Sequence, residues 1–530
     1  MTAGPTRVLM LVENDVVIDT RVQKEALALA CAGLDVTLLG VAPGHERLDE
    51  QLGPCRLVRV PVGTAAADRA GARRARLRAL TARSAPRPEH VAELRAAMAE
   101  RRRQLAAASR EAASHRPEGP AGAVVYKAGV AGRWVRRELL RVRGRALTVQ
   151  HRSRRRLHDV QQKVWRELDR RHAASTDRAA WRRDLPEVHD FVRAVAPVVD
   201  ELAPDVLHAH DVRTTIVAAH AVERARAQGR ELPWVYDAHE YVAGLSLYGP
   251  RTPRVVAAWT TLEAEFVRSA DRVITVSPEI AVELQQRYTL PRRPAVVLNI
   301  PRDAEAGAGS GPRLRDMIGL AEDIPLLVYS GKVTAARGVQ TAVEALVSMP
   351  DTHLAVVAVP NARDHRVTAL AKLAARRGVT DRLHLVDPVP PSQVVGLLSS
   401  ATAGLIPLLH FGSHEMALTN KLFEYLHARI PVLVSDCRAQ ARFVRDAGVG
   451  EVFTAEDADS LAQAATAVVK DRAAYVASIT DDLLAEYSWA RQEEHLRDLY
   501  RDLLGAPALR AEDDLAPLPD GAMVPTAGTA

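Results

Sequence analysis

Two cations follow an apolar, strand-like run in the second half of the chain. Residues 324–329 read IPLLVY, and Gly331, Lys332 and Arg337 come after them. A glycine lets the backbone turn at the end of a strand, and the two cations would then stand near the start of a helix expected over 338–346. Because cations beside free helix N–H groups bind phosphates, this stretch predicts a diphosphate site.

A second polar group lies in the stretch 403–436, which predicts a strand, a polar loop, a helix and another strand. The helix contains Asn420, Lys421 and Glu424. Lys421 and Glu424 share one helical face, so a cation could meet a phosphate while the carboxylate accepts hydrogen bonds from sugar hydroxyls. The alternative is an ordinary amphipathic helix between two strands.

Histidines follow two apolar runs in the first half of the chain. The run 205–211 ends in His208 and His210, and the run 234–241 contains His239. Polar side chains at the carboxyl ends of parallel strands line the cleft of a doubly wound sheet. No third ligand stands at a metal-site spacing. We therefore expect a functional His239 with His210 beside it, a structural His208, and no bound metal.

Predicted strands and helices, which could position these residues, alternate along most of the chain. Residues 7–12 and 35–41 predict strands on either side of a helix at 21–32, which is the opening of a parallel, doubly wound α/β sheet. The first turn lacks the GxGxxG pattern of dinucleotide-binding proteins. This absence disfavours an NAD-dependent oxidoreductase.

Composition sets outer bounds on the protein. Its 530 residues are enough for two or more domains. The three cysteines, Cys31, Cys55 and Cys437, lack metal-ligand spacing and suggest a reducing compartment. Neither a secretory signal nor an apolar run long enough to span a bilayer is recognisable. We therefore expect a cytoplasmic protein.

Residues 65–185 differ from the rest of the chain. They hold 31 Lys and Arg against 12 Asp and Glu, in a chain whose formal net charge is +6. The segment predicts a basic helical insertion that could meet an anionic membrane through 101–103 and 152–156, with Trp134 and Trp165. A solvated insertion is the alternative, and no nucleic-acid-binding motif is present. Four prolines are expected to interrupt its helices: Pro86, Pro88, Pro117 and Pro120.

Two stretches resemble one known family. Residues 420–436, NKLFEYLHARIPVLVSD, resemble the nucleotide-sugar signature of the retaining glycosyltransferases of family 4 (group 1), which have the GT-B fold. Residues 330–346 resemble the family's G-R-L-x3-K-G motif, with Lys332 and Arg337 exchanging the order of the two cations. The resemblance implies that both cations hold a nucleotide diphosphate and that Glu424 binds the ribose.

The chain departs from the family at the first Glu of its E-x7-E motif. That position is Met416, and Glu415 stands one place away. Either the loop shifts so that Glu415 contacts the donor sugar, or the contact is absent. We carry Glu415 as a candidate catalytic residue.

The first domain also resembles the family. The sequence VYDAHE resembles its strand-end histidine motif, which implies that His239 faces the reaction centre. In the family acceptors lie near the first loop, here residues 13–20 and without the usual glycines. Asp15 and Arg21 are therefore candidate acceptor contacts, although a solvated helix-start arginine is an equal alternative.

The predicted fold class is α/β of the GT-B type: two doubly wound Rossmann-like domains face each other across a cleft, and the N-terminal one carries a helical insertion. The expected order is an acceptor domain at 1–304 with the insertion at 65–190, a linker at 305–323, a donor domain at 324–486, a helix at 487–504 that crosses back, and a disordered tail at 505–530.

The predicted function is retaining transfer of a sugar from a nucleoside-diphosphate sugar to an acceptor hydroxyl, without cofactor or metal. An acceptor glycan or glycolipid would place the enzyme in cell-surface polysaccharide or glycolipid synthesis, at the inner face of the cell membrane. Nucleic acid is not an expected partner. The alternatives are a GT-B sugar-nucleotide epimerase and a degenerate donor-binding scaffold, the latter motivated by Met416.

Overall fold

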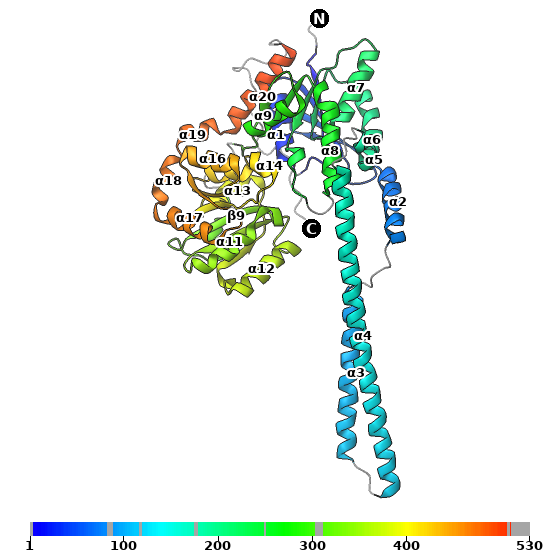
Figure 1. Ribbon diagram of the computed structural model, residues 1–530. Coiled ribbons are helices and arrows are strands. Elements are labelled where there is room, and N and C mark those ends of the chain that lie inside the picture. The colour runs from blue at the N-terminus through cyan, green and yellow to red at the C-terminus, as the bar shows by residue number, and fades with distance from the viewer. Residues whose placement is uncertain are drawn as a thin grey trace. The chain divides into compact units, whose positions relative to one another are not determined.

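The computed structural model describes residues 4–17, 19–81, 88–115, 119–173, 179–247, 251–302, 311–505 and 509. The chain divides into two compact units. The larger unit comprises 1–66 and 176–530, and the smaller one comprises 67–175 (Figure 1). The larger unit holds two mainly parallel sheets, and the smaller unit is helical.

The first sheet has eight strands in the order β3-β4-β2-β1-β5-β6-β7-β8. Its pairs are parallel except β3 with β4, an antiparallel hairpin at one edge. The apolar residues of central β1 are buried, as expected for a parallel strand covered on both faces. The strands are β1 (Arg7–Leu11), β2 (Asp35–Val41), β3 (Leu48–Leu52), β4 (Cys55–Val60), β5 (Val206–His210), β6 (Trp234–Ala238), β7 (Arg272–Thr275) and β8 (Ala295–Val296).

Helix α1 (Thr20–Cys31) packs against this sheet and buries several polar side chains, among them Arg21, Lys24 and Glu25. Asp19 caps it by accepting from the Val22 N–H. Buried charges on a helix are rare unless they are paired, so α1 already indicates a specialised environment. The other helices of this domain are α5 (Ala180–Asp184), α6 (Pro186–Leu202), α7 (Thr215–Ala227), η1 (Val242–Gly244), α8 (Pro253–Phe266), η2 (Val267–Ser269) and α9 (Pro278–Tyr288).

The insertion is shorter than the predicted 65–190. The separate unit ends at Ser175, and Trp181, Leu185 and Val188 belong to the core of the N-terminal domain. The insertion consists of α2 (Ala65–Thr81), α3 (Pro88–Ser114) and α4 (Pro120–Ala173). Pro88 and Pro120 do not interrupt helices but begin them, because a first helical residue needs no N–H donor.

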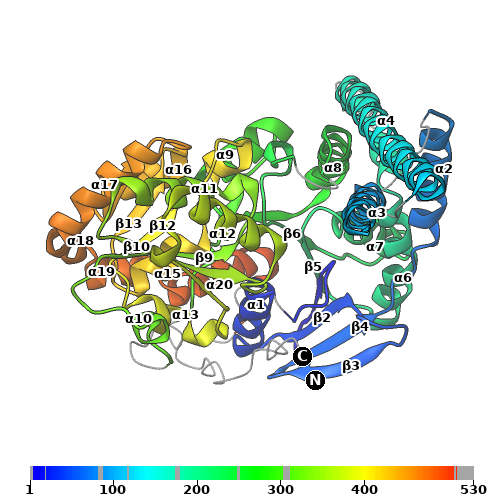
Figure 2. The same cartoon turned by 90° about the horizontal axis from the view of Figure 1, so that it is seen from below.

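The second sheet is parallel, with six strands in the order β11-β10-β9-β12-β13-β14. Helices α11 and α12 cover one face, and α13 and α15 cover the other (Figure 2). Its strands are β9 (Leu326–Lys332), β10 (His353–Val359), β11 (Leu383–Val386), β12 (Ala403–Ile406), β13 (Val432–Ser435) and β14 (Gly450–Phe453). Its helices are α10 (Leu314–Ile318), η3 (Ala335–Arg337), α11 (Val339–Ala345), η4 (Leu346–Ser348), α12 (His365–Arg377), η5 (Thr380–Arg382), α13 (Pro391–Leu398), α14 (Gly412–Met416), α15 (Asn420–His427), α16 (Arg438–Ala447), α17 (Ala458–Lys470), α18 (Arg472–Ser478) and α19 (Asp481–Glu486).

Two segments bear on the predicted domain boundaries. Part of the predicted linker, α10, packs into the core of the C-terminal domain through Leu314, whereas 303–310 lie outside the described residues. Helix α20 (Trp489–Leu504) lies beside α1 (Figure 1) and packs Trp489 and Tyr500 into the N-terminal core. The predicted disordered tail lies outside the described residues apart from Gly505 and Leu509.

The two domains of the larger unit touch through glycines. A Cβ on Gly244 of η1 would lie 2.6 Å from the backbone of Gly412 in α14. Next to this contact, Met416 packs on the N-terminal core and its carbonyl accepts a hydrogen bond of 2.6 Å from Ser277 Oγ. The loop before α15 is therefore docked on the other domain.

No helix among the described residues is both long and apolar enough to cross a bilayer.

Candidate active site

A cavity of about 620 Å³ is lined by residues of both domains of the larger unit. The carboxyl ends of β6 and β9 open into it, as is usual for ligand sites in doubly wound folds. A larger hollow of about 820 Å³ is lined by residues around β7, β8 and α20 and contains no C-terminal-sheet residue. The lining of the smaller cavity includes Gly331 and the polar residues Asp19, Arg21, Lys24, His239, Glu240, Arg251, Lys332, Arg337, His414, Asn420, Lys421 and Glu424.

Cations dominate the C-terminal wall of this cavity. Lys332, Arg337 and Lys421 line it, and Glu424 is the single carboxylate among the described C-terminal lining residues. Burial, followed by the charge of Arg337, lowers the pKa of Lys421 to about 8. The charge of a bound anion would oppose both effects, because it favours the ammonium form of Lys421. The wall is therefore built to receive negative charge.

Glycines bring these cations together. Gly331 has φ +130°, and a Cβ there would lie 2.6 Å from Lys421 Nζ. Gly338 has φ +65°, and its Cβ would lie 1.9 Å from the Pro407 carbonyl oxygen. Any larger residue would push the turn that carries Arg337 away from the sheet. The close packing therefore fixes the spacing of the cations.

The start of α15 also faces the cavity. Its N-cap residue Thr419 hydrogen-bonds Gln440 at 3.1 Å, and no described side chain caps the helix. Thr419 and Asn420 line the cavity, so the first N–H groups of α15 are available to a ligand. Together with the helix dipole, these groups favour a phosphate or another anion.

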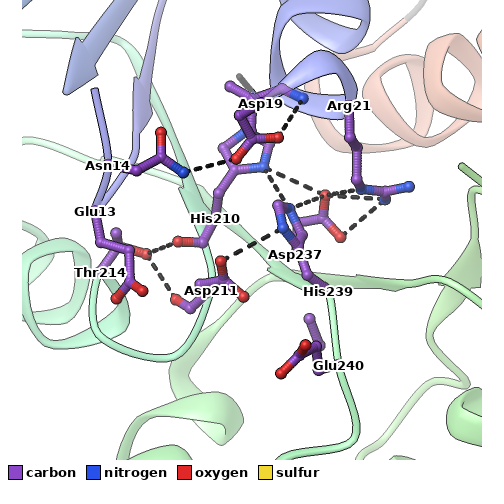
Figure 3. Close-up of polar contacts among 12 residues, drawn as sticks. Glu13, Asn14, Asp19, Arg21, His210, Asp211, Thr214, Asp237, His239 and Glu240 are labelled. Atoms are coloured by element: carbon purple, nitrogen blue, oxygen red, sulfur yellow. Dashed lines mark hydrogen bonds and ion pairs between the residues drawn. The ribbon is translucent and has the colours of Figure 1, made fainter. Parts of the chain in front are cut away.

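The N-terminal wall contains a buried charge network centred on Asp237 (Figure 3). Two Arg21 nitrogens, Nε and Nη2, donate to the Asp237 carboxylate at 3.0 and 2.9 Å. Arg21 also forms an ion pair of 2.9 Å with Glu25. The pKa of Asp237 lies well below its usual range because Arg21 and His239 outweigh the effect of burial. The carboxylate is therefore ionised, and it holds Arg21 and His239 in place.

His239 lies between two carboxylates. Its Nε2 is 3.3 Å from Asp237, and its Nδ1 is 3.5 Å from Asp211. Burial acts to lower the pKa of His239, but Asp211 and Asp237 prevail and raise it to about 10. At neutral pH the ring is an imidazolium with both N–H groups directed at protein carboxylates. His239 can thus present positive charge to the cavity but is not a general base.

Behind His239 the network becomes neutral. His239 Nε2 lies 3.1 Å from His210 Nδ1, and His208 Nδ1 lies 3.0 Å from the Tyr500 hydroxyl. Burial lowers the pKa of both His208 and His210. Possible ligand atoms of Glu25, His208, His210 and Asp237 lie within 4.8 Å of one another. Arg21 already supplies positive charge to both carboxylates, so we assign no metal to this group.

The structure brings most of the predicted site residues to one cavity. Arg21 is 3% exposed and ion-paired, so the alternative of a solvated arginine is wrong. His210 supports His239 from behind and does not line the cavity. Those at the wall are Arg21, His239, Gly331, Lys332, Arg337, Asn420, Lys421 and Glu424.

Glu415 does not line the cavity. Its carboxylate lies 2.5 Å from His410 Nδ1 and accepts at 3.0 Å from the Arg438 N–H, the first residue of α16. The short helix α14 turns Glu415 toward this helix start, where a carboxylate is stabilised by the helix dipole. The structure therefore does not place Glu415 where it could replace the carboxylate missing at Met416.

Asp15 also stays outside the cavity, where its side chain accepts from the Val17 N–H at 3.2 Å. Asp19 lines the cavity in its place. The sequence signal for Asp19 was its position as a helix N-cap. Lys24 and Arg251 carried no comparable signal, since each reaches the cavity only through the tertiary fold.

Comparison with known proteins agrees with this architecture. Residues 137–305 match the model of Glycosyltransferase Family 4, and residues 324–471 match the model of Glycosyl transferases group 1. The chain belongs to the family 4, group 1 glycosyltransferases. It is therefore a sugar-transferring enzyme. The first match begins inside α4, so β1 to β4 lie outside it.

Among named relatives, the D-inositol 3-phosphate glycosyltransferase of Nocardia farcinica is 26% identical over 368 residues, which are 59% of this chain and 80% of that protein. An uncharacterized glycosyltransferase of Methanocaldococcus jannaschii is 23% identical over 307 residues, 56% of this chain and 75% of that protein. Both similarities extend over more than half of this glycosyltransferase.

A solved structure, sucrose-phosphate synthase from Thermosynechococcus elongatus, superimposes with a TM-score of 0.60 and 14% identity over 94% of this chain and 99% of that chain. The α,α-trehalose-phosphate synthase (UDP-forming) from Burkholderia xenovorans, in complex with glucose-6-phosphate, gives a TM-score of 0.54 and 13% identity over 94% and 100%. These likenesses confirm the predicted GT-B fold of the glycosyltransferase.

Proposed function

We propose that the enzyme transfers a sugar, with retention of anomeric configuration, from a nucleoside-diphosphate sugar to an acceptor hydroxyl. The observation that carries this proposal is the crowding of Lys332, Arg337 and Lys421 on the C-terminal wall. Breaking the bond between sugar and diphosphate develops negative charge on the leaving group. Fixed cations at that position stabilise the transition state more than the ground state.

Glu424 completes the donor site. It lies one turn after Lys421 on α15 and faces the same cavity. A carboxylate there can accept hydrogen bonds from two neighbouring ribose hydroxyls, which suits a nucleoside rather than a bare diphosphate. The structural neighbour from Burkholderia xenovorans is a UDP-forming synthase, so a uridine nucleotide is the first donor to test.

The N-terminal wall would hold the acceptor and the transferred sugar. Because His239 is an imidazolium between Asp211 and Asp237, we assign it to positioning and not to proton abstraction. The acceptor's proton would pass to the leaving diphosphate, on the same face that the acceptor attacks. This front-face route accounts for retention without a protein nucleophile.

For the acceptor we propose only a chemical class. A polyhydroxylated acceptor fits the acidic and hydroxyl-binding side chains Asp19 and Glu240 at the N-terminal wall. We place the reaction in the synthesis of a cell-surface polysaccharide or glycolipid, with a glycan or glycolipid as acceptor and no metal or cofactor. Mass spectrometry of products from a panel of such acceptors tests this assignment.

Calorimetry with UDP, GDP and ADP tests the donor site. One nucleotide should bind to the wild-type protein, and Glu424→Ala and Lys332→Ala/Arg337→Ala should each weaken that binding at least about tenfold. Glu344→Ala is the matched control, because Glu344 lies in the same domain but pairs with Arg377 outside the cavity. Wild-type affinity in Glu424→Ala would refute the donor-site assignment.

Product analysis separates transfer from the alternatives. A transferase releases nucleoside diphosphate and a glycosylated acceptor, whereas an epimerase needs no separate acceptor. Nucleotide binding without turnover of any donor and acceptor pair would contradict the proposed reaction and favour donor binding alone.

A further inference from the structure

Helix α4 of the insertion presents apolar side chains to solvent near its N-terminal end. Val124, Leu139 and Val142 are 67%, 62% and 56% exposed, and Val135 is exposed as well. Ala128 and Ala131 are exposed between them. Successive members of this set are three or four residues apart, so they form one stripe along the helix. Six exposed apolar residues in line exceed the scattered apolar residues of an ordinary surface.

The stripe is not the face that packs on α3. Helices α3 and α4 run side by side in the insertion (Figure 1). The less exposed residues of this part of α4 include Tyr126, Gly129, Leu140 and Gly144. At about 100° per residue, this second set lies on the opposite side of the helix from Val124, Val135 and Val142. In the hairpin, one face of α4 therefore packs against α3, and the opposite face has no described partner.

Cations border the stripe on both sides. Residues 120–146 contain seven Lys and Arg but a single acidic residue, Glu138, which pairs with Arg141 at 2.6 Å. By helical position Arg136 and Arg143 lie along one border, and Lys127 and Arg145 lie along the other. All four of these side chains are exposed. Trp134, 63% exposed, stands near the border formed by Lys127 and Arg145.

We propose that this face of α4, residues 121–146, binds the surface of an anionic lipid bilayer. An apolar stripe bordered by cations is the pattern of a helix lying in the membrane interface, with its apolar side in the acyl boundary and its cations at the phosphates. Tryptophan favours the same interface because its ring is apolar and its N–H is polar. The face differs from the one expected from composition, which centred on 101–103 and 152–156.

Two other occupants fit the observations less well. A second copy of α4 would bring two cation-bordered stripes together, and like charges at the borders of a helical seam oppose pairing. A nucleic acid would neutralise the cations but would leave Val135 and Leu139 in water, because phosphate contacts bury little apolar surface. Charge complementarity together with apolar burial favours the bilayer.

Vesicle flotation of the full-length protein tests the proposal. The protein should float with vesicles made of equal parts phosphatidylcholine and phosphatidylglycerol, and much less with phosphatidylcholine alone. Val135→Gln/Leu139→Gln should weaken binding to the anionic vesicles at least about tenfold, since it removes two apolar side chains from the stripe. Glutamine keeps the helical propensity high, so the helix should persist.

The matched control is Met317→Gln/Val347→Gln, which alters two exposed apolar residues of the C-terminal domain and should leave flotation unchanged. Circular dichroism and nucleotide calorimetry on all variants separate loss of the face from loss of folding. Undiminished flotation of Val135→Gln/Leu139→Gln would overturn the proposal, and so would equal binding to neutral vesicles. Wild-type dimers that this variant dissociates, without vesicle binding, would instead assign the face to a second copy.

Discussion

The two walls of the cavity handle charge in opposite ways. On the N-terminal wall, Arg21 and His239 are held by Asp237 within the protein. On the C-terminal wall, Lys332, Arg337 and Lys421 gather around one lining carboxylate, Glu424. The cations Arg21 and His239 of the first wall are thus already paired with a protein carboxylate before any ligand binds. The second reaches balance only when an anion arrives.

This difference shows how a transferase can hold one wall of its cavity rigid while the other wall responds to the charge of a ligand. A buried network of ion pairs and hydrogen bonds holds its geometry without a ligand. A wall with excess positive charge gains most from a ligand whose negative charge increases during the reaction. Substitutions should therefore affect mainly folding stability at the N-terminal wall and mainly ligand affinity at the C-terminal wall.

Asp237→Asn should have the largest effect, on stability. It removes the charge that holds Arg21 and His239, and breaking a buried ion pair costs about 3–5 kcal/mol. Urea unfolding followed by circular dichroism measures the loss. Asp205→Asn, at the exposed pair with Arg7, serves as control and should cost less than about 1 kcal/mol. Equal losses in the two variants would remove the distinction between a paired network and a surface ion pair.

Gly331→Ala should weaken nucleotide binding about tenfold and should lower the free energy of unfolding by less than Asp237→Asn does. The new Cβ would displace Lys421 Nζ and would strain a residue at φ +130°. Gly319→Ala is the control, because Gly319 also has a positive φ, +65°, but open space around it. Calorimetry of both variants compares the loss of affinity at the cavity with the loss caused by a positive-φ substitution elsewhere in the same domain. Equal nucleotide affinities would show that Lys421 does not contact the ligand.

Nucleotide affinity should fall as pH rises above about 8. In the free protein burial holds the pKa of Lys421 at about 8, so its amine loses a proton there. A bound diphosphate favours the ammonium form, so binding is strongest below this pH and weakens by up to about tenfold per pH unit above it. Calorimetry in buffers of different ionisation enthalpy should detect proton uptake. Lys421→Arg should remove that pH dependence, and an unchanged profile in this variant would contradict the assignment.

Glu415→Gln should have the smallest effect. It weakens the contacts with His410 and with the start of α16, which should cost about 1 kcal/mol of stability. Nucleotide affinity should stay at the wild-type value, because Glu415 lies outside the cavity lining. A tenfold loss of affinity would return Glu415 to the donor site.

The sequence predicted the central parallel strands and the helix that carries Glu424. Where apolar residues face a core, their spacing along the chain distinguishes a strand from a helix. Sequence patterns missed β3, whose residues Asp49, Glu50 and Gln51 are exposed at a sheet edge and show no apolar alternation. They also extended the insertion too far, because the arginines around Trp181 obscured the apolar spacing of Trp181, Leu185 and Val188.

Side-chain roles that depend on distant partners were beyond the sequence. The sequence left Arg21 either as an acceptor contact or as a solvated arginine, and only the fold brings Asp237, far along the chain, against it. Glu415 was a candidate because it stands one place from the motif position at Met416. The direction of its side chain depends on the start of α16, whose Arg438 N–H it accepts from. Motif spacing could locate the cations of the C-terminal wall, whereas tertiary pairing determined the arrangement of the N-terminal wall.

The glycine contact between the domains limits how the donor preference of this enzyme could be redesigned. The loop that precedes α15 meets η1 backbone to backbone at Gly412 and Gly244. A loop transplanted from a relative with a side chain at position 412 would wedge the two halves apart, whatever sugar it recognised. Libraries that vary this loop should therefore keep both glycines and an apolar residue at Met416, and should diversify the positions that line the cavity.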